Sequence, residues 1–133
     1  MRGLVIALAA LAVCLGCVDP EKRDPAETAA EALSAEADRQ FEDAFRTILM
    51  GGADKAAAKF EALRSRKDLG GRRAADCVFW MGFCAESRGR EAEARAHYRE
   101  VAEKFAKSRY AEMAKERLER LDASLAGVEA AGQ

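Results

Sequence analysis

The sequence predicts an all-α protein built from stacked helix-turn-helix repeats. Half of the 133 residues are hydrophobic, with alanine prominent among them, whereas 34% are charged and only two are proline. This mixture favours helices over strands, because alanine and the long charged residues have high helix propensity and β-branched residues are scarce. Apolar residues also recur at steps of three and four, which places them on one face of successive helices.

The length and the charge of the chain limit the classes of function. A chain of 133 residues forms one domain of ordinary size, so a large multidomain enzyme is excluded. Lys and Arg number 22 against 23 Asp and Glu, which gives a net charge of −1. A balanced charge provides no general attraction to a phosphate backbone, so no nucleic-acid partner is expected.

Residues 1–16 are predicted to be a secretory signal peptide. Arg2 supplies a positive charge, and residues 3–15 form an uncharged apolar run that is too short to cross a bilayer of about 30 Å as a helix. The run ends in Gly16 and Cys17, which resemble the lipobox of bacterial lipoproteins. That resemblance implies that Cys17 becomes the mature N-terminus and carries fatty acyl chains such as palmitate. Cys14 stands where the family usually has leucine, and an ordinary cleavage site at residues 10–12 is the alternative.

The first helix is predicted to begin at Pro25 and to end at Gly51 and Gly52. Asp24 provides an N-capping carboxylate, Pro25 occupies the first helical position and Glu27 places an acid in the first turn. Paired glycines stop the helix, because they cost helix stability and supply the positive φ angles of a turn. The apolar face consists of Ala26, Ala30, Leu33, Ala37, Phe41, Ala44 and Ile48.

Four further helices are expected. The second begins near Asp54, and a charged connector over residues 65–71 separates it from a third over residues 73–88. A fourth spans residues 91–106, and Ser108 can cap a fifth. The inward-facing residues are Ala56, Phe60 and Leu63 in the second helix, Ala94, Tyr98, Val101 and Phe105 in the fourth, and Ala111, Ala114, Leu118, Leu121 and Leu125 in the fifth.

An internal repeat predicts how these helices stack. Five positions recur after 38 residues, namely Ala44 and Gly82, Gly51 and Gly89, Ala56 and Ala94, Phe60 and Tyr98, and Leu63 and Val101. Small residues let neighbouring helices approach closely, and the aromatic residue one turn later fills the space beside that contact. The pattern predicts stacked helix-turn-helix repeats.

These residues resemble the tetratricopeptide repeat (TPR), whose pattern is W-x2-L-G-x2-Y followed by A-x3-F and P. The matches are Met81, Gly82, Ala94 and Tyr98 in the second copy and Ala56 and Phe60 in the first. The departures are Val78, Ala85 and Ala106, where the family has Trp, Tyr and Pro, and a period of 38 rather than 34 residues. The resemblance covers residues 37–121 and implies two TPR-like repeats plus a C-terminal capping helix.

Within that superfamily, residues 79–84 and 105–108 are similar to repeats of the periplasmic Tol-Pal coordinator and of the lipoprotein component of the outer-membrane β-barrel assembly machine. This similarity implies a lipid-anchored domain in the periplasm of the bacterial cell envelope, at the outer membrane in preference to the inner. The expected organisation is a signal peptide (1–16), a lipidated tether (17–24), a TPR-like helical domain (25–126) and a disordered tail (127–133).

The groove of this superfamily is lined by the first helix of each repeat, which identifies candidate partner-binding residues. On the third helix these are Trp80, Phe83 and Ser87, although core packing is an equal alternative for Trp80. On the first helix they are Arg39, Asp43, Arg46 and Met50. The expected function is a non-enzymatic, membrane-anchored module that binds a segment of another envelope protein through this groove.

Two other functions are considered. One is a self-associating periplasmic scaffold with Leu33, Phe41 and Phe45 as its dimer seam. The other is a small thiol-dependent redox enzyme that uses Cys77 or Cys84. These two cysteines lie seven residues apart, so their Cα atoms should be about 10.5 Å apart on a helix, too far for a disulfide.

No catalytic residue, cofactor site or metal site is predicted. His97 is the only histidine, no CxxC motif occurs, and buried cysteines ordinarily act as small apolar residues. The connector and its flanks carry a net charge of +4, from five cations against Asp68; the cations are Arg64, Arg66, Lys67, Arg72 and Arg73. A solvated loop is the expected role for these cations, and contact with phospholipid headgroups, a phosphorylated polymer or an acidic partner is the alternative.

Overall fold

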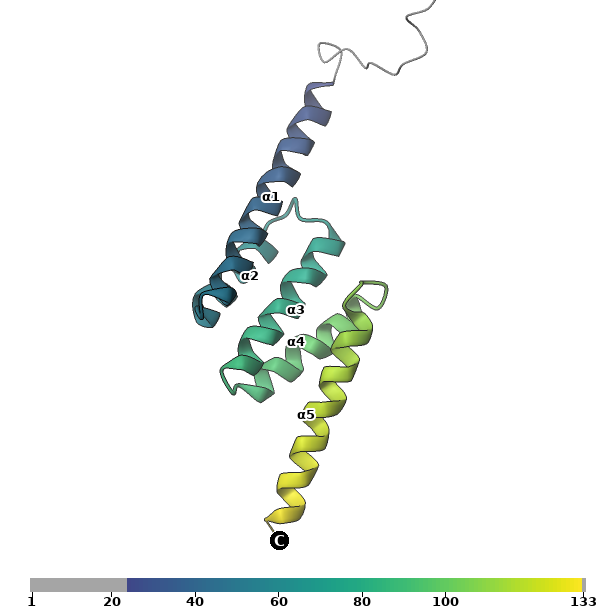
Figure 1. Ribbon diagram of the computed structural model, residues 1–133. Helices are drawn as coiled ribbons and strands as arrows, with labels where there is room; N and C mark the ends of the chain where they lie inside the picture. Colours follow the sequence, from purple (N-terminus) through teal and green to yellow (C-terminus); the bar gives the residue numbers. More distant parts are fainter. Residues whose placement is uncertain (1–23, 133) are drawn as a thin grey trace, which may run out of the picture. The chain divides into compact units, whose positions relative to one another are not determined.

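The computed structural model describes residues 24–132, which form five α-helices and no strand (Figure 1). The fold is all-α, as predicted. The predicted signal peptide, Cys17 and most of the predicted tether lie outside these residues. Among the described helices, none is both long enough and apolar enough to span a membrane.

The chain divides into two compact units, Met1–Ala32 and Leu33–Gln133. The described part of the first unit is the start of α1 (Pro25–Leu49), whose residues before Leu33 are exposed. The predicted N-cap is confirmed, because the Ala26 N–H donates to Asp24 Oδ1 at 2.9 Å.

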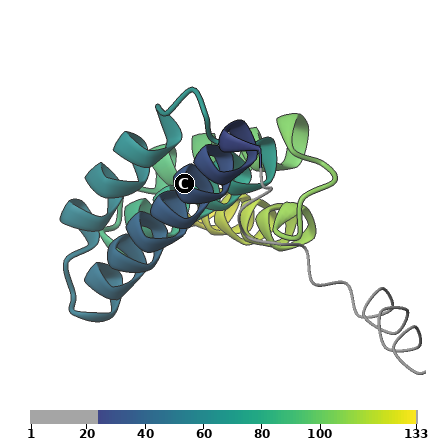
Figure 2. The same ribbon diagram turned by 90° about the horizontal axis from the view of Figure 1, so that it is seen from above.

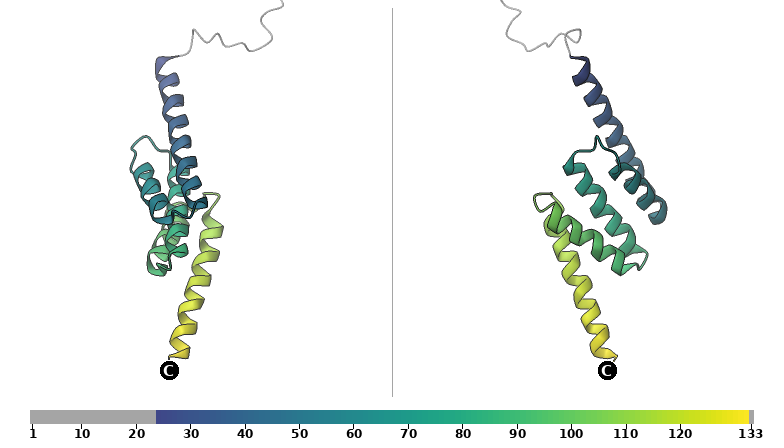
Figure 3. Two further views of the ribbon diagram at one scale, coloured as in Figure 1. Left: turned by 60° about the vertical axis from the view of Figure 1, so that its left-hand side comes forward. Right: turned by 180° about the vertical axis from the view of Figure 1, so that it is seen from behind.

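The second unit contains the rest of α1 followed by α2 (Ala53–Arg64), α3 (Gly71–Ser87), α4 (Glu91–Lys104) and α5 (Ala111–Ala131). Helix α2 packs against α3, α3 against α4, and α4 against α5. Neighbouring helices in this series run in opposite directions, as the two views in Figure 3 show. The loops α2–α3 and α4–α5 lie at one end of these helices, the end seen from above in Figure 2, and the turn α3–α4 lies at the other.

The two turns predicted from the repeat have the expected backbone. Gly51 has φ of 81° and Gly89 has φ of 70°, and among the described residues these are the two positive values. L side chains rarely adopt this conformation, which explains why glycine stands at both positions.

The repeated residues other than the two turn glycines are buried. One cluster joins α1, α2 and α3 around Ala44, Ala56 and Phe60, and a second joins α3, α4 and α5 around Ala94 and Tyr98. All five side chains have no exposed surface. The paired positions are therefore equivalent in burial as well as in sequence, and burying them stabilises the stack by removing apolar surface from water.

Gly82 allows a close approach of α4 to α3. A Cβ atom at this position would lie 2.8 Å from Tyr98 Cε1 and 3.2 Å from His97 Cβ. The small residue predicted at this position is therefore required by the approach of α4 to α3.

The boundaries of the last two helices differ from the prediction. Helix α4 ends at Lys104, and α5 begins at Ala111 with Tyr110 rather than Ser108 at the N-cap. Helix α5 also continues to Ala131, so residues 127–131 are helical where a disordered tail was expected. One glycine, Gly127, costs about 1 kcal/mol relative to alanine, which is too little to end a helix flanked by good helix formers.

Candidate functional site

The candidate site is an aromatic surface on α1, α3 and the loop before α5. Trp80 on α3 is half-buried and packs edge-on against three phenylalanine rings. Its ring centroid lies 4.8 Å from that of Phe45, 5.6 Å from that of Phe79 and 5.3 Å from that of Phe83. Edge-on pairs of this kind add favourable interactions to the burial of their surface.

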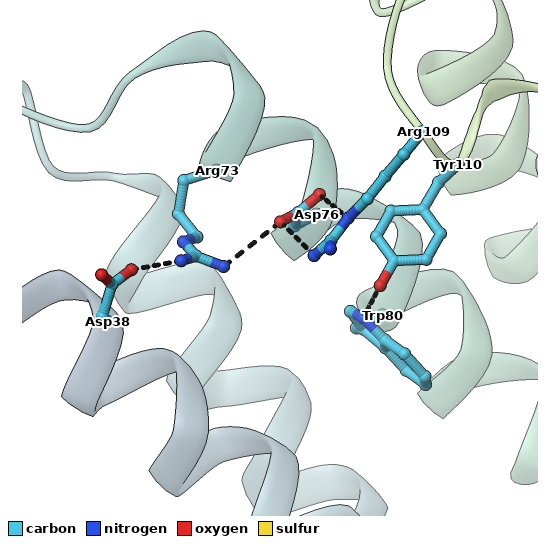
Figure 4. A network of polar contacts seen from close by, with 6 residues as sticks. All are labelled: Asp38, Arg73, Asp76, Trp80, Arg109 and Tyr110. Carbon is cyan, nitrogen blue, oxygen red and sulfur yellow. Dashed lines mark hydrogen bonds and ion pairs between the residues drawn. The ribbon is translucent and has the colours of Figure 1, made fainter.

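Tyr110 completes this surface. Its ring stacks on Phe79 with 4.3 Å between centroids, and its hydroxyl accepts a hydrogen bond of 3.2 Å from Trp80 Nε1 (Figure 4). We call Phe45, Phe79, Trp80, Phe83 and Tyr110 the aromatic cluster. Because Trp80 contacts both core clusters while it keeps an accessible edge, the two roles considered for it are compatible.

A small pocket on α1 adjoins the aromatic cluster. It has a volume of about 300 Å³ and is lined by Phe41, Glu42, Phe45, Arg46 and Leu49. Phe45 belongs to both features, and Leu49 is 73% exposed. The pocket therefore combines an apolar floor with one carboxylate and one guanidinium group, which suits an apolar side chain of a partner with polar groups beside it.

The structure brings together only some of the predicted partner-binding residues. Trp80 and Phe83 are in contact, and Arg46 lines the adjoining pocket. Asp43 instead lies on the α2 side of α1, where it accepts a hydrogen bond of 2.6 Å from Lys59 Nζ.

The other three predicted residues lie apart from the aromatic cluster. Arg39 is exposed and pairs with Glu36 at 2.6 Å on the same helix. Met50 is 81% exposed at the turn after α1, and the exposed Ser87 donates a hydrogen bond to the Cys84 carbonyl. The helical period alone places several faces of α1 on the surface and does not decide which of them meets α3.

Sequence reasoning missed Leu49, Tyr110 and Arg117. Leu49 lies four residues after Phe45, which is a helical spacing that could have indicated a second apolar stripe on α1. Tyr110 lies in a loop, where periodicity gives no signal. Arg117 of α5 places its guanidinium group 5.3 Å from the Phe83 ring centroid, a contact that only the fold creates.

A polar network lies beside the aromatic cluster (Figure 4). The carboxylate of Asp76 on α3 is almost fully buried and accepts hydrogen bonds from Arg73 at 3.2 Å and from Arg109 at 2.8 Å. Arg73 also pairs with Asp38 of α1 and lies 4.5 Å above the Phe41 ring centroid. The network thus connects α1, α3 and the loop before α5 and fixes their positions around Trp80.

A second, partly buried carboxylate connects α3 with α4 and α5. Glu86 Oε2 accepts a hydrogen bond of 2.7 Å from the Tyr98 hydroxyl and one of 2.6 Å from Arg117 Nη1. Burial raises the pKa of Glu86, but these hydrogen bonds and the positive charge of Arg117 outweigh it and hold the pKa below its ordinary value. Burial and the bond to Glu86 raise the pKa of Tyr98.

Cys77 and Cys84 are buried and free. Burial raises the pKa of the Cys77 thiol to about 12 and that of the Cys84 thiol to about 11. Because the thiolate is the nucleophile, neither side chain presents an activated nucleophile at neutral pH.

His97 is half-buried, and its Nε2 lies 3.9 Å from Glu93. Within residues 24–132, no group of three or more His, Cys, Asp or Glu side chains converges on a possible metal position.

The cations of the connector are largely paired. Arg64 binds Glu100 of α4 at 2.7 Å, Arg66 binds Asp68 at 2.5 Å, and Arg73 belongs to the network around Asp76. Among the five cations of this run, Lys67 and Arg72 have no ion-pair partner in the described part of the chain. The run of positive charge in the sequence is therefore not one basic patch in space.

Comparison with known proteins identifies no relative: no family model, curated protein sequence or solved structure matches the chain.

Proposed function

We propose that this chain is a membrane-anchored, non-enzymatic protein-protein interaction module of the bacterial cell envelope. Its TPR-like repeats bind a segment of another envelope protein at the surface that α1 and α3 form around Trp80. The lipid on Cys17 confines the domain to the membrane and raises its effective concentration near membrane partners.

One observation carries this proposal, namely the partly exposed Trp80 beside the pocket lined by Phe41, Phe45 and Leu49. Partly exposed aromatic residues that neighbouring rings hold in place are typical anchors of protein interfaces. Exposed Leu49 adds apolar surface at the edge of the pocket, where a bound peptide would cover it. The segment that fits carries an apolar or aromatic side chain with charged residues beside it, because Glu42 and Arg46 flank the pocket.

Self-association through Leu33, Phe41 and Phe45 is the alternative function. The ring centroid of Phe41 lies 5.4 Å from that of Phe60, and the ring centroid of Phe45 lies 4.8 Å from that of Trp80. Part of the surface of both rings is therefore covered within one subunit. Leu33 is 49% exposed. The proposed dimer seam therefore offers less exposed apolar surface than the sequence suggested.

A capture experiment from solubilised native membranes tests the proposal. We expect the lipidated full chain to recover one envelope protein and the Leu49→Asp variant to lose it. Leu49 is exposed, so this change leaves the core intact. Val128→Asp is the matched control, because it also replaces an exposed apolar side chain with a carboxylate, at 68% exposure on α5.

The captured partner is then tested by direct titration. Trp80 is the only tryptophan in the chain, so its fluorescence reports on the proposed surface. A peptide from the partner should shift the Trp80 emission of the parent and of Val128→Asp, and should bind Leu49→Asp about tenfold or more weakly. Recovery of only this chain itself would favour the scaffold, and equal loss in both variants would refute binding at this surface.

A further inference from the structure

Outside the proposed peptide surface, two cations without an ion-pair partner among the described residues line one pocket, which lies between the start of α3 and the loop that joins α4 to α5. The pocket has a volume of about 790 Å³. Such a volume lies within the range of roughly 300 to 1,000 Å³ that is usual for small-molecule sites. Both segments lie at the same end of the helices, as Figure 1 shows.

Four of the nine residues that line this pocket are basic. They are Arg72 from α3, Lys104 from the end of α4, and Lys107 and Arg109 from the loop, with Glu103 as the only carboxylate of the lining. Four cations against one carboxylate give the lining a formal charge of +3. Arg72 precedes the other three cations by more than 30 residues, so its place beside them is not evident from the sequence.

Two of these cations are uncompensated. Lys104 lies 3.3 Å from Glu100 and Arg109 binds Asp76 at 2.8 Å, whereas Arg72 and Lys107 have no ion-pair partner among residues 24–132. Arg72 and Lys107 come from different segments and face one pocket. Two free charges on separate walls match a dianion better than a single carboxylate, and guanidinium and ammonium groups are the common ligands of phosphate.

The rest of the lining is compatible with a phosphate ester. Phe105 and Ala106 add apolar surface that an organic substituent could contact. The Ser108 hydroxyl oxygen belongs to the same lining, is buried, and has no hydrogen-bond partner in the described part of the chain. Gly71 has open space where a side chain would stand, so an anion can approach the first turn of α3, whose dipole adds to the positive potential.

From this arrangement we infer that the pocket between α3 and the α4–α5 loop binds a phosphate monoester group, either in solution or as the headgroup of an anionic lipid. Arg72 and Lys107 are the principal ligands, and Lys104 and Arg109 contribute charge from the rim. No lining residue of the pocket belongs to the aromatic cluster, and Arg109 connects the two features by lying 4.8 Å over the Tyr110 ring centroid. The inference does not depend on peptide binding at the aromatic cluster.

Calorimetric titration of the full chain with inorganic phosphate, at constant ionic strength, tests the site. The parent should show saturable binding, which Arg72→Gln combined with Lys107→Gln weakens about tenfold or more, because two charged donors are removed. Lys55→Gln combined with Arg99→Gln is the matched control. It removes two exposed cations on α2 and α4 outside the pocket lining and should bind phosphate like the parent.

Vesicles distinguish the two sources of the phosphate group. Phosphatidylcholine vesicles that contain phosphatidic acid should retain the parent and the control variant more than the Arg72/Lys107 variant if the site takes a lipid headgroup. Binding of inorganic phosphate without this difference identifies a soluble ligand. Absence of saturable binding to both probes, or equal losses in the pocket variant and its control, would overturn the inference. Circular dichroism checks that all variants keep the helicity of the parent.

Discussion

At the scale of single residues, the absence of a side chain at Gly82 allows α4 to pack closely against α3. Gly82 lies inside α3, where glycine costs about 1 kcal/mol relative to alanine in helix propensity. The neighbouring Tyr98 ring occupies the space that a Cβ atom would need, at 2.8 Å. Packing thus outweighs propensity at this position.

We therefore expect Gly82→Ala to destabilise the protein by about 1 to 2 kcal/mol, because the cost of overpacking exceeds the gain in helix propensity. Urea unfolding followed by the fluorescence of Trp80 measures this change. The matched control is Gly127→Ala in α5, where nothing lies within 4 Å of the added Cβ atom. It should stabilise the protein by up to about 1 kcal/mol. A Gly82→Ala protein as stable as the parent would show that α4 can move away from α3.

At the scale of helices, charged hydrogen bonds connect neighbours that apolar contacts alone would leave free to slide. Glu86 of α3 joins Tyr98 of α4 and Arg117 of α5, and Asp76 of α3 joins Arg109 before α5. Apolar burial is not directional, whereas a carboxylate with two donors fixes a specific arrangement.

The lowered pKa of Glu86 makes the stability of this arrangement depend on pH. A carboxyl whose pKa is depressed on folding contributes stability above its unfolded value of about 4.5 and loses it as the pH falls through the folded pKa. Glu86→Gln should lower the unfolding temperature at pH 7, at a cost of about 1 to 2 kcal/mol. The difference between parent and variant should shrink below about pH 4.

Thermal unfolding at a series of pH values measures this difference. Glu112→Gln serves as the control, because Glu112 is 79% exposed and pairs only with Lys115 on the same helix. Its pH profile should follow that of the parent. A parent-to-variant difference for Glu86→Gln that is constant from pH 7 to pH 3 would contradict the role given to the ionised carboxylate.

At the scale of the whole molecule, the helical domain and the N-terminal sequence carry different parts of the proposed function. In the proposal, the described helices provide the surface for a partner, and residues 1–17 of the sequence provide the attachment to a membrane. The two parts can be tested separately, since the predicted lipid site lies outside the described residues.

Labelling with radioactive palmitate in a bacterial host tests the attachment. The parent and Cys14→Ala should incorporate label and sediment with membranes, because the lipobox resemblance assigns the lipid to Cys17. Cys17→Ala should lose the label. Label that persists in Cys17→Ala, or that requires Cys14, would contradict the assignment.

The sequence by itself determined the helices, their turns and most of the core, because these depend on local propensity and on a period that repeats. Phe60 and Tyr98, or Gly51 and Gly89, could be paired from their spacing, and each pair has the same burial or backbone in the structure.

Only the tertiary structure decided which faces of α1 and α3 meet. That choice places Phe45 beside Trp80 and turns Asp43 toward Lys59. It also pairs most cations of the connector and brings Arg72 to Lys107 across 35 residues of sequence. Charges and loop residues follow no period, so their neighbours are set by the packing of the helices that carry them.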